Sequence, residues 1–401
     1  MRMRFGWQPD GCRREGILST LPRGARVVLT HRGKTAIHMA GRALNLKPGD
    51  QVLVPAYNCG SEIDPLLCLG AEVVMYDVDP RMPVSPEELV PLLGPKIRAV
   101  YVTHYWGLVH PLAGLRALCN ERRIALIEDA ALSLFSRGPE GPVGSVGDVS
   151  VFSLVKSLPV PDGGALAINS KGLAVRSRLG RPPVREILRV GLPLVRPRGA
   201  HVDVVWRYLG HLRAGLRQLG CREESMDCDG NLPDMPASYY FRDELASAGM
   251  SSLTRWMLGC FDGHSIVERR RANYSTLAEA VGRLSGITPF LPELPAETCP
   301  LVFPFVVENR NEVCMELDQR GIAAIPWWAG YHRRLTWEKY PKARFLKDHV
   351  VALPVPQQID GRGCAYMAEA VKDLRDSGKL RPVDQEGTGA RLSFEGQHGG
   401  L

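Results

Sequence analysis

Short apolar segments alternate with helical patterns from about residue 26 to about residue 170. The expected strands span residues 26–30, 51–55, 72–77, 97–103 and 124–128. Helical patterns fall between them, at residues 35–45, 61–69, 86–93 and 112–122. Strands and helices that alternate at this spacing predict an α/β fold, with a mostly parallel sheet covered by helices on both faces.

The rest of the chain does not keep this rhythm. The stretch 171–250 is rich in arginine and proline, residues 251–285 show a long helical pattern, and mixed strand and helix patterns follow residue 299. A small α+β domain is expected from that last pattern. We therefore expect an irregular segment at 1–25, a large domain at 26–250 with an insertion at 171–250, a long helix and small domain at 251–380, and a disordered tail at 381–401.

Composition restricts the class of protein. The 401 residues are 45% hydrophobic and 23% charged, as in a soluble globular protein. The net charge of +7 favours anionic partners such as phosphates or sugar nucleotides, but it is too diffuse to indicate nucleic-acid binding. The ten cysteines are scattered, without a CxxC pair or zinc spacing, which favours reduced thiols in a cytoplasmic protein and no metal site. Neither a signal peptide nor a membrane-spanning apolar stretch is recognisable.

One lysine lies in a position suited to chemistry. Lys156 follows the apolar run at 151–155 and precedes a Pro-bounded turn with Gly163 and Gly164. A lysine after a strand is usually a solvated surface charge. In a partly dry site, however, a lysine loses its charge more easily and becomes a nucleophile for carbonyl carbons. Lys156 is therefore our candidate for binding an aldehyde cofactor as an imine.

A carboxylate ends another expected strand. Asp129 follows the buried-strand pattern at 124–128, and an unpaired carboxylate is costly there. It could serve simply as the N-cap of a helix. The alternative is a partner for a protonated pyridine nitrogen, which keeps a cofactor ring electron-withdrawing. Ligands of open α/β sheets gather at the carboxyl ends of strands, so the position favours the second interpretation.

Three residues open the first expected helix directly after a strand. Backbone N–H groups at a helix start suit a phosphate, and Gly33, Lys34 and Thr35 stand at this start. Ser153 could donate a hydrogen bond to the same phosphate. Ordinary helix starts and strand ends contain the same residue types, so these four are candidates only as a set. His104, at the end of another strand, is a candidate supporting residue.

These segments, in this order, resemble the DegT/DnrJ/StrS-type aminotransferases, a fold-type I family that uses pyridoxal 5′-phosphate (PLP). The resemblance covers roughly residues 26–170 and 250–375. Its motifs are Gly33-Lys34-Thr35-Ala36-Ile37, Lys47-Pro48-Gly49-Asp50-Gln51-Val52, Val54-Pro55-Ala56-Tyr57, Gly70-Ala71-Glu72-Val73-Val74, Asp77-Val78-Asp79, Ile127-Glu128-Asp129-Ala130-Ala131, the segment 152–164, Arg320-Gly321-Ile322 and Leu353-Pro354-Val355-Pro356.

The resemblance implies a seven-stranded-type, mostly parallel sheet in the large domain and a homodimer. It also implies that Lys156 forms a Schiff base with PLP and carries the proton, and that Asp129 faces the pyridine nitrogen. The phosphate would lie among the remaining cofactor-binding candidates, which are Gly33, Lys34, Thr35 and Ser153. The implied activity is the transfer of an amino group from glutamate to a nucleotide-linked keto-sugar. Such a reaction belongs to sugar and polysaccharide biosynthesis.

The chain also departs from the family pattern. Lys34 stands where many members have threonine, Leu132 stands where Gln or His is common, and only Tyr57 supplies an aromatic ring near Cys59. The usual Asn-containing loop before the long helix is not recognisable. These departures keep two alternatives open. One is PLP chemistry on a non-sugar ketone such as a keto-cyclitol, and the other is a catalytically silent PLP-binding sensor.

Overall fold

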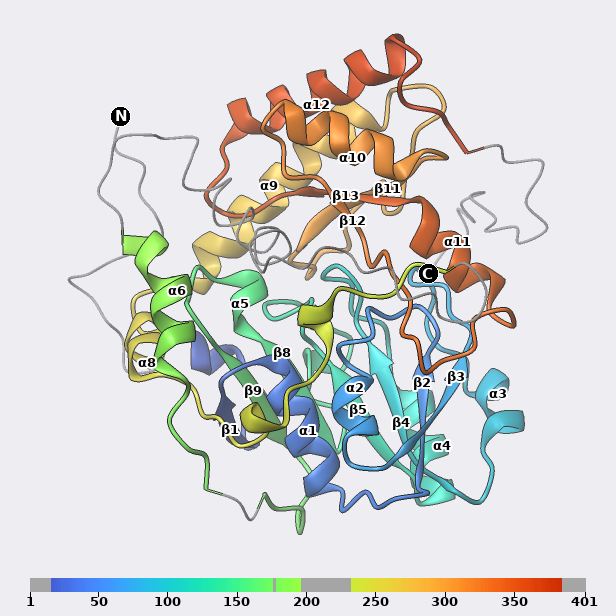
Figure 1. Cartoon of the computed structure of the whole chain (residues 1–401), viewed down its shortest axis with the longest axis vertical. Helices are drawn as coiled ribbons and strands as arrows, with labels where there is room; N and C mark the ends of the chain where they lie inside the picture. The colour runs from blue at the N-terminus through green and yellow to red at the C-terminus, as the bar shows by residue number, and fades with distance from the viewer. Residues whose placement is uncertain (1–15, 176–177, 196–231, 384–401) are drawn as a thin grey trace.

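The structure is a computed structural model in which residues 16–175, 178–195 and 232–383 are described. These residues form a large sheet and a smaller one, with helices around both (Figure 1). The expected disordered tail lies almost wholly outside the described residues, as do most of the irregular N-terminal segment and the middle of the insertion. The predicted domain bounds therefore stay predictions.

The large sheet has seven strands in the order β1-β9-β8-β5-β4-β2-β3. Every pair from β3 to β8 is parallel, and β9 alone runs antiparallel to its neighbours β8 and β1. The predicted mostly parallel seven-stranded sheet is thus confirmed. The strands are β1 (Arg26–Thr30), β2 (Gln51–Pro55), β3 (Glu72–Tyr76), β4 (Ile97–Thr103), β5 (Ala125–Asp129), β8 (Val149–Ser153) and β9 (Gly164–Ile168).

The central strands are buried along almost their whole length, because helices cover the sheet. Helix α1 (Gly33–Ala43) packs against β1, β8 and β9 through a stripe of fully buried residues that includes Ala36, Met39 and Ala40. The other helices of this part are α2 (Asp64–Leu67), α3 (Pro86–Leu89), α4 (Ala113–Arg122), α5 (Leu154–Ser157) and α6 (Val184–Val195).

A second sheet, fully antiparallel, belongs to the expected small α+β domain, which is confirmed. Its order is β10-β11-β13-β12, and Figure 1 shows it above the large sheet with α9, α10 and α12 over it. A separate apolar core fills the space between this sheet and its helices. The elements are β10 (Thr288–Pro289), β11 (Val302–Val306), β12 (Ile325–Pro326), β13 (Val350–Pro354), α9 (Gly263–Val281), α10 (Arg310–Gln319), α11 (Pro341–His349) and α12 (Gly361–Asp376).

The helical pattern at 251–285 is divided into two helices, α8 (Ser252–Leu258) and α9. The division occurs because Asp262 caps α9, where its side chain accepts hydrogen bonds from the N–H groups of His264 and Ser265. The shorter elements are η2 (Ile17–Thr20), η3 (Val90–Leu92), β6 (Arg137–Gly138), β7 (Gly141–Pro142), η4 (Ala237–Tyr239) and η5 (Asp243–Leu245).

Two features are absent from the described ranges. None of their helices has the length and apolar character needed to cross a bilayer. Within the same ranges, no group of three or more His, Cys, Asp or Glu side chains is arranged to hold a metal ion.

Candidate active site

The predicted site residues lie at, or just after, the carboxyl ends of strands that share one edge of the large sheet. Because β9 is antiparallel to both β1 and β8, those two strands run in the same direction, which is also that of β5. Gly33 begins α1 just after β1, and α5 after β8 carries Lys156. Asp129 ends β5. The fold therefore brings together residues that are more than a hundred positions apart in the sequence, at the edge where such sheets bind ligands.

Lys156 and Asp129 are close enough for their charges to interact. Lys156 is half-buried in α5, and Asp129 pairs in the sheet with Val151 of the adjacent strand β8. Burial raises the pKa of the Asp129 carboxyl, and the ammonium of Lys156 opposes that rise. Across residues 16–175, 178–195 and 232–383, no group forms a hydrogen bond with Lys156 Nζ. Its amine is therefore not committed to a structural contact.

Two hydrogen bonds fix the orientation of the Asp129 carboxylate. Its Oδ2 accepts a hydrogen bond of 2.7 Å from the Tyr101 hydroxyl, and its Oδ1 accepts one of 2.8 Å from the N–H of Ala131. Sequence reasoning missed Tyr101. The available signal was a tyrosine within the apolar strand at 97–103, since a buried tyrosine hydroxyl normally needs a polar partner.

The start of α1 and the end of β8 approach each other closely. A Cβ placed on Gly33 would lie 3.3 Å from Ser153 Cβ and 3.6 Å from Ser153 Oγ. Helix α1 has no side-chain cap, and in the described part of the chain the Ser153 hydroxyl forms no hydrogen bond. The N–H groups of a helix start and an unused hydroxyl thus lie close together, and these are donors suited to a phosphate group.

The side chains of Lys34 and Thr35 are directed to another segment. Lys34 Nζ donates hydrogen bonds to the carbonyl oxygens of Ser238 (2.8 Å) and Tyr240 (2.9 Å), and Thr35 Oγ1 donates one to Leu245 O at 3.0 Å. Burial lowers the pKa of Lys34 to about 8. In this structure, only the backbone N–H groups of these two residues are therefore available to bind a phosphate beside Ser153.

The loop after β2 brings Cys59 near Lys156. The Cys59 thiol donates a hydrogen bond of 2.8 Å to Glu62 Oε2, and the Cys59 N–H donates one of 3.0 Å to Glu62 Oε1. Burial, and then the nearby Glu62, raises the pKa of Cys59 to about 12, while the positive charge of Lys156 opposes this rise. Cys59 is therefore a neutral thiol next to the candidate lysine. Neither Cys59 nor Glu62 was predicted to form part of the site.

The aromatic ring expected near Cys59 is committed to packing. Tyr57 is fully buried, with its ring centroid 5.5 Å from that of Tyr105 and 5.1 Å from that of Trp328. Trp328 belongs to the C-terminal part of the chain. This aromatic cluster thus joins the loop after β2 to the small domain.

His104 has a structural role. Its Nε2 lies 3.0 Å from Glu128 Oε1, and the carboxylate of Glu128 also accepts hydrogen bonds from the N–H groups of Val146 and Gly147. This contact anchors the turn before β8.

Sequence reasoning also missed Arg270 of α9, which is 3% exposed and donates a hydrogen bond to Ser157 O, one residue after Lys156. A run of arginines in a helical pattern was the only signal for it.

Residues 16–190 match the sequence model of the DegT/DnrJ/EryC1/StrS aminotransferase family. This range contains every predicted site residue. This part of the chain, 175 of its 401 residues, is similar to that family. The match agrees with the expected resemblance to PLP-dependent aminotransferases.

A curated relative matches part of the chain. GDP-perosamine synthase from Vibrio cholerae is 32% identical over 141 residues, which are 34% of this chain and 38% of that protein. The chain thus matches little more than a third of the length of this relative.

Solved structures extend the likeness over most of the chain. DesV from S. venezuelae has a TM-score of 0.62 at 19% identity, and the match covers 92% of this chain and 88% of that one. Spr1654 from Streptococcus pneumoniae, in a structure described as its PMP form, has a TM-score of 0.62 at 17% identity and covers 90% of each chain. At these identities the likeness establishes the fold, and it confirms the expected fold-type I architecture.

Proposed function

We propose that this protein is a PLP-dependent aminotransferase that transfers an amino group from glutamate to a keto-sugar linked to a nucleotide. The observation that carries the proposal is the juxtaposition of Lys156 and Asp129. An uncommitted amine lies within electrostatic reach of a buried, oriented carboxylate at the ligand-binding edge of the sheet. Gly33 and Ser153 lie close to each other at the same edge of the sheet.

The residues present fit PLP. The N–H groups at the start of α1 and the Ser153 hydroxyl would hold its phosphate. Asp129 would face the pyridine nitrogen, and Lys156 Nζ would bind the aldehyde carbon covalently. When bound, PLP supplies an electron sink for the carbon atoms between which the amino group moves. Lys156 Nζ, once free, can accept and return the proton that this transfer requires.

The nature of the acceptor is inferred from charge and from relatives. The net charge of +7 favours a substrate with phosphates, as a nucleotide-linked sugar has. The name of the curated relative, GDP-perosamine synthase, includes such a nucleotide.

We further propose that the protein works as a cytoplasmic homodimer, as the family resemblance implies. Analytical ultracentrifugation would test the oligomeric state, and a monomer would contradict it.

The first experiment tests the covalent role of Lys156. The apoprotein is titrated with PLP, reduced with borohydride and digested, and the modified peptide is identified by mass spectrometry. We expect modification at Lys156 in the wild type and no absorbance change from a covalent adduct in Lys156→Ala. Lys171→Ala, which removes an exposed lysine after β9, is the matched control and should behave as the wild type. A wild-type protein that takes up no PLP would refute the proposal.

A second experiment separates the proposed acceptor from its alternatives. The PLP-loaded protein is incubated with glutamate and either nucleotide-linked keto-sugars or keto-cyclitols, and aminated products are measured by mass spectrometry. Products from keto-cyclitols alone would favour the non-sugar alternative. The sensor alternative is motivated by Leu132, which is buried where many members carry a polar residue. It would be favoured if the protein bound PLP but no amino donor changed its spectrum.

A further inference from the structure

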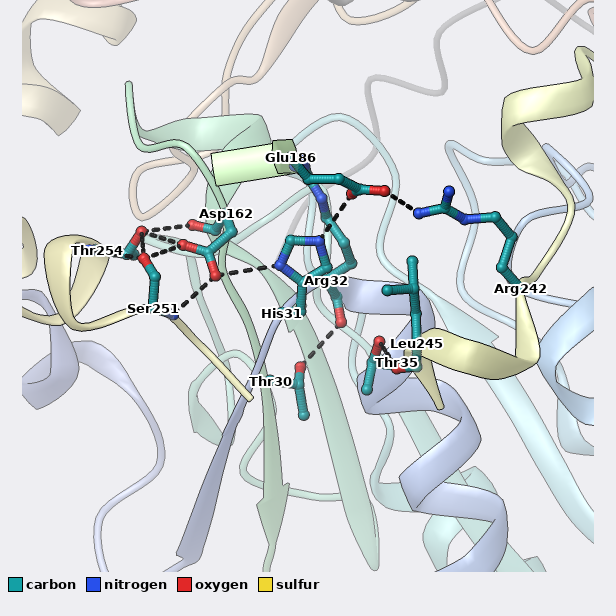
Figure 2. A network of polar contacts seen from close by, with 10 residues as sticks. All are labelled: Thr30, His31, Arg32, Thr35, Asp162, Glu186, Arg242, Leu245, Ser251 and Thr254. Carbon is teal, nitrogen blue, oxygen red and sulfur yellow. Dashed lines mark hydrogen bonds and ion pairs between the residues drawn. The ribbon is translucent and has the colours of Figure 1, made fainter. Parts of the chain in front are cut away.

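A histidine close to the start of α1, where the phosphate is proposed to bind, lies between two carboxylates. His31 is 0% exposed, and its Nδ1 lies 3.2 Å from Asp162 Oδ2 while its Nε2 lies 3.1 Å from Glu186 Oε2 (Figure 2). The three residues come from the end of β1, the loop between α5 and β9, and helix α6. One imidazole thus connects three segments that are far apart in the sequence.

Backbone contacts also fix the position of His31. Its carbonyl accepts a hydrogen bond of 2.7 Å from the N–H of Gly163, and its own N–H donates one of 2.9 Å to Ala248 O. Arg32, the next residue, packs closely against Gly164, because a Cβ on Gly164 would lie 2.4 Å from the carbonyl carbon of Arg32. The residue that precedes the start of α1 is therefore held directly against the loop that follows Lys156.

The two carboxylates are themselves held in place. Asp162 accepts hydrogen bonds from the N–H (2.8 Å) and hydroxyl (2.6 Å) of Ser251, and another from the Thr254 hydroxyl. Glu186 also pairs with Arg242 (Figure 2). The imidazole therefore occupies a preformed anionic site, since its partners need no rearrangement to face it.

The contacts define the protonation state of the ring. Each ring nitrogen faces a carboxylate oxygen, so both nitrogens must donate, and only the protonated imidazole can do so. Burial alone would lower the pKa of His31, but the hydrogen bonds to Asp162 and Glu186 outweigh it and raise the pKa, against a smaller opposing effect of Arg32. The charged groups around the ring are thus Asp162, Glu186 and Arg32, with Arg242 behind Glu186.

We propose that His31 is a positioning residue for the cofactor phosphate: clamped between Asp162 and Glu186, it holds the turn at residues 32–35 against the loop after Lys156. This inference rests on the proposed function, because the phosphate is that of PLP. The network fixes the N–H groups of Gly33 and its neighbours beside Ser153 before the phosphate arrives. It also links helix α6, through Glu186, to the order of this turn.

The experiment compares PLP with pyridoxal, which lacks the phosphate. In His31→Gln, we expect PLP affinity to fall about 10-fold, whereas pyridoxal affinity changes less than about 2-fold. Glu186→Gln, whose side chain lies at the edge of the network, should show the same pattern with a smaller loss, and it guards against misfolding of the first variant. His349→Gln removes a histidine near Glu308 in the small domain and should leave both affinities unchanged.

Two further readouts distinguish this inference from the proposed function. Hydrogen exchange of the apoprotein should show faster exchange at residues 32–36 in His31→Gln than in the wild type, whether or not PLP binds. As pH rises through the raised pKa of His31, the difference between wild type and variant should shrink, because the wild-type ring loses the proton that both contacts need. Unchanged exchange, or equal losses for PLP and pyridoxal, would overturn the inference. A wild type without PLP affinity would refute the proposed function and the phosphate role with it, whereas faster exchange in His31→Gln would still show that His31 orders this turn.

Discussion

At the scale of single residues, Asp129 combines burial with a negative charge that the proposed chemistry needs. It is 5% exposed, and its two hydrogen bonds together with the Lys156 charge do not fully offset burial, so its pKa is raised. A carboxyl whose pKa is raised in the folded state costs stability when it is ionised. Replacing Asp129 with a neutral residue should therefore remove this charge without lowering the stability of the folded protein.

Asp129→Asn should separate activity from stability. We expect amino transfer to fall by about 100-fold or more, because the negative charge opposite the pyridine nitrogen is lost. The apoprotein should be at least as stable as the wild type at neutral pH, since Asn retains the shape and the Tyr101 hydroxyl can turn to accept a hydrogen bond. This stability difference should shrink as the pH falls and the wild-type carboxyl becomes neutral. Thermal unfolding across pH measures it.

Asp148→Asn is the matched control for that variant. Asp148 precedes β8 at the opposite edge of the sheet, where it pairs with Arg116 and accepts a hydrogen bond from the Leu126 N–H, and its pKa is lowered. Its ionised form therefore stabilises the fold, and the Asn variant should lose stability at neutral pH. Changes of the same sign in both Asn variants would contradict this account of Asp129.

At the scale of elements, the first residue of α1 belongs to the proposed phosphate site. Gly33→Ala would place a methyl group 3.3 Å from Ser153 Cβ. We expect PLP affinity to fall about 10-fold, as for the loss of one hydrogen bond to a charged group, with little change in pyridoxal affinity. Spectral titration with both ligands measures the effect. Equal affinity of wild type and variant for PLP would place the phosphate elsewhere.

The control for Gly33→Ala is a glycine in the same position of another helix. Gly361 is the first residue of α12, and a Cβ there would meet nothing within 4 Å. Gly361→Ala should leave PLP affinity unchanged and should not destabilise the protein, because alanine has the higher helix propensity. The pair of variants separates the filling of the space from the general effect of alanine at a helix start.

The elements were largely predictable from the sequence, whereas many contacts at the site were not. Apolar runs bounded by turn residues gave the strands of the large sheet, and their parallel order placed Lys156 and Asp129 at one edge. The contact of Lys34 with Ser238, 204 positions away, could not be predicted from the sequence. The same holds for the contact of His31 with Glu186, 155 positions away. Such contacts depend on how loops pack in three dimensions, and no periodic pattern encodes them.

At the scale of the whole molecule, a buried lysine joins the small domain to the site. Lys347 of α11 is 0% exposed, and its Nζ donates hydrogen bonds to the carbonyl oxygens of Asn58 (2.6 Å), Gly330 (2.9 Å) and Trp328 (3.2 Å). Asn58 lies in the loop after β2, directly before Cys59. The position of that loop beside Lys156 therefore depends on a residue nearly 290 positions further along the chain.

Lys347→Met should destabilise the protein by about 3 kcal/mol, because it leaves three buried carbonyl groups without their donor. Burial lowers the pKa of Lys347 to about 8 from the ordinary 10.5, so the unfolded chain binds more protons between these values and the wild type gains stability as pH rises there. The gap to the Met variant should therefore widen above about pH 8, as measured by chemical denaturation. Lys372→Met, at an exposed pair with Asp376, should change the stability little. A small loss at Lys347 that did not depend on pH would show that the aromatic cluster alone holds the small domain against the loop.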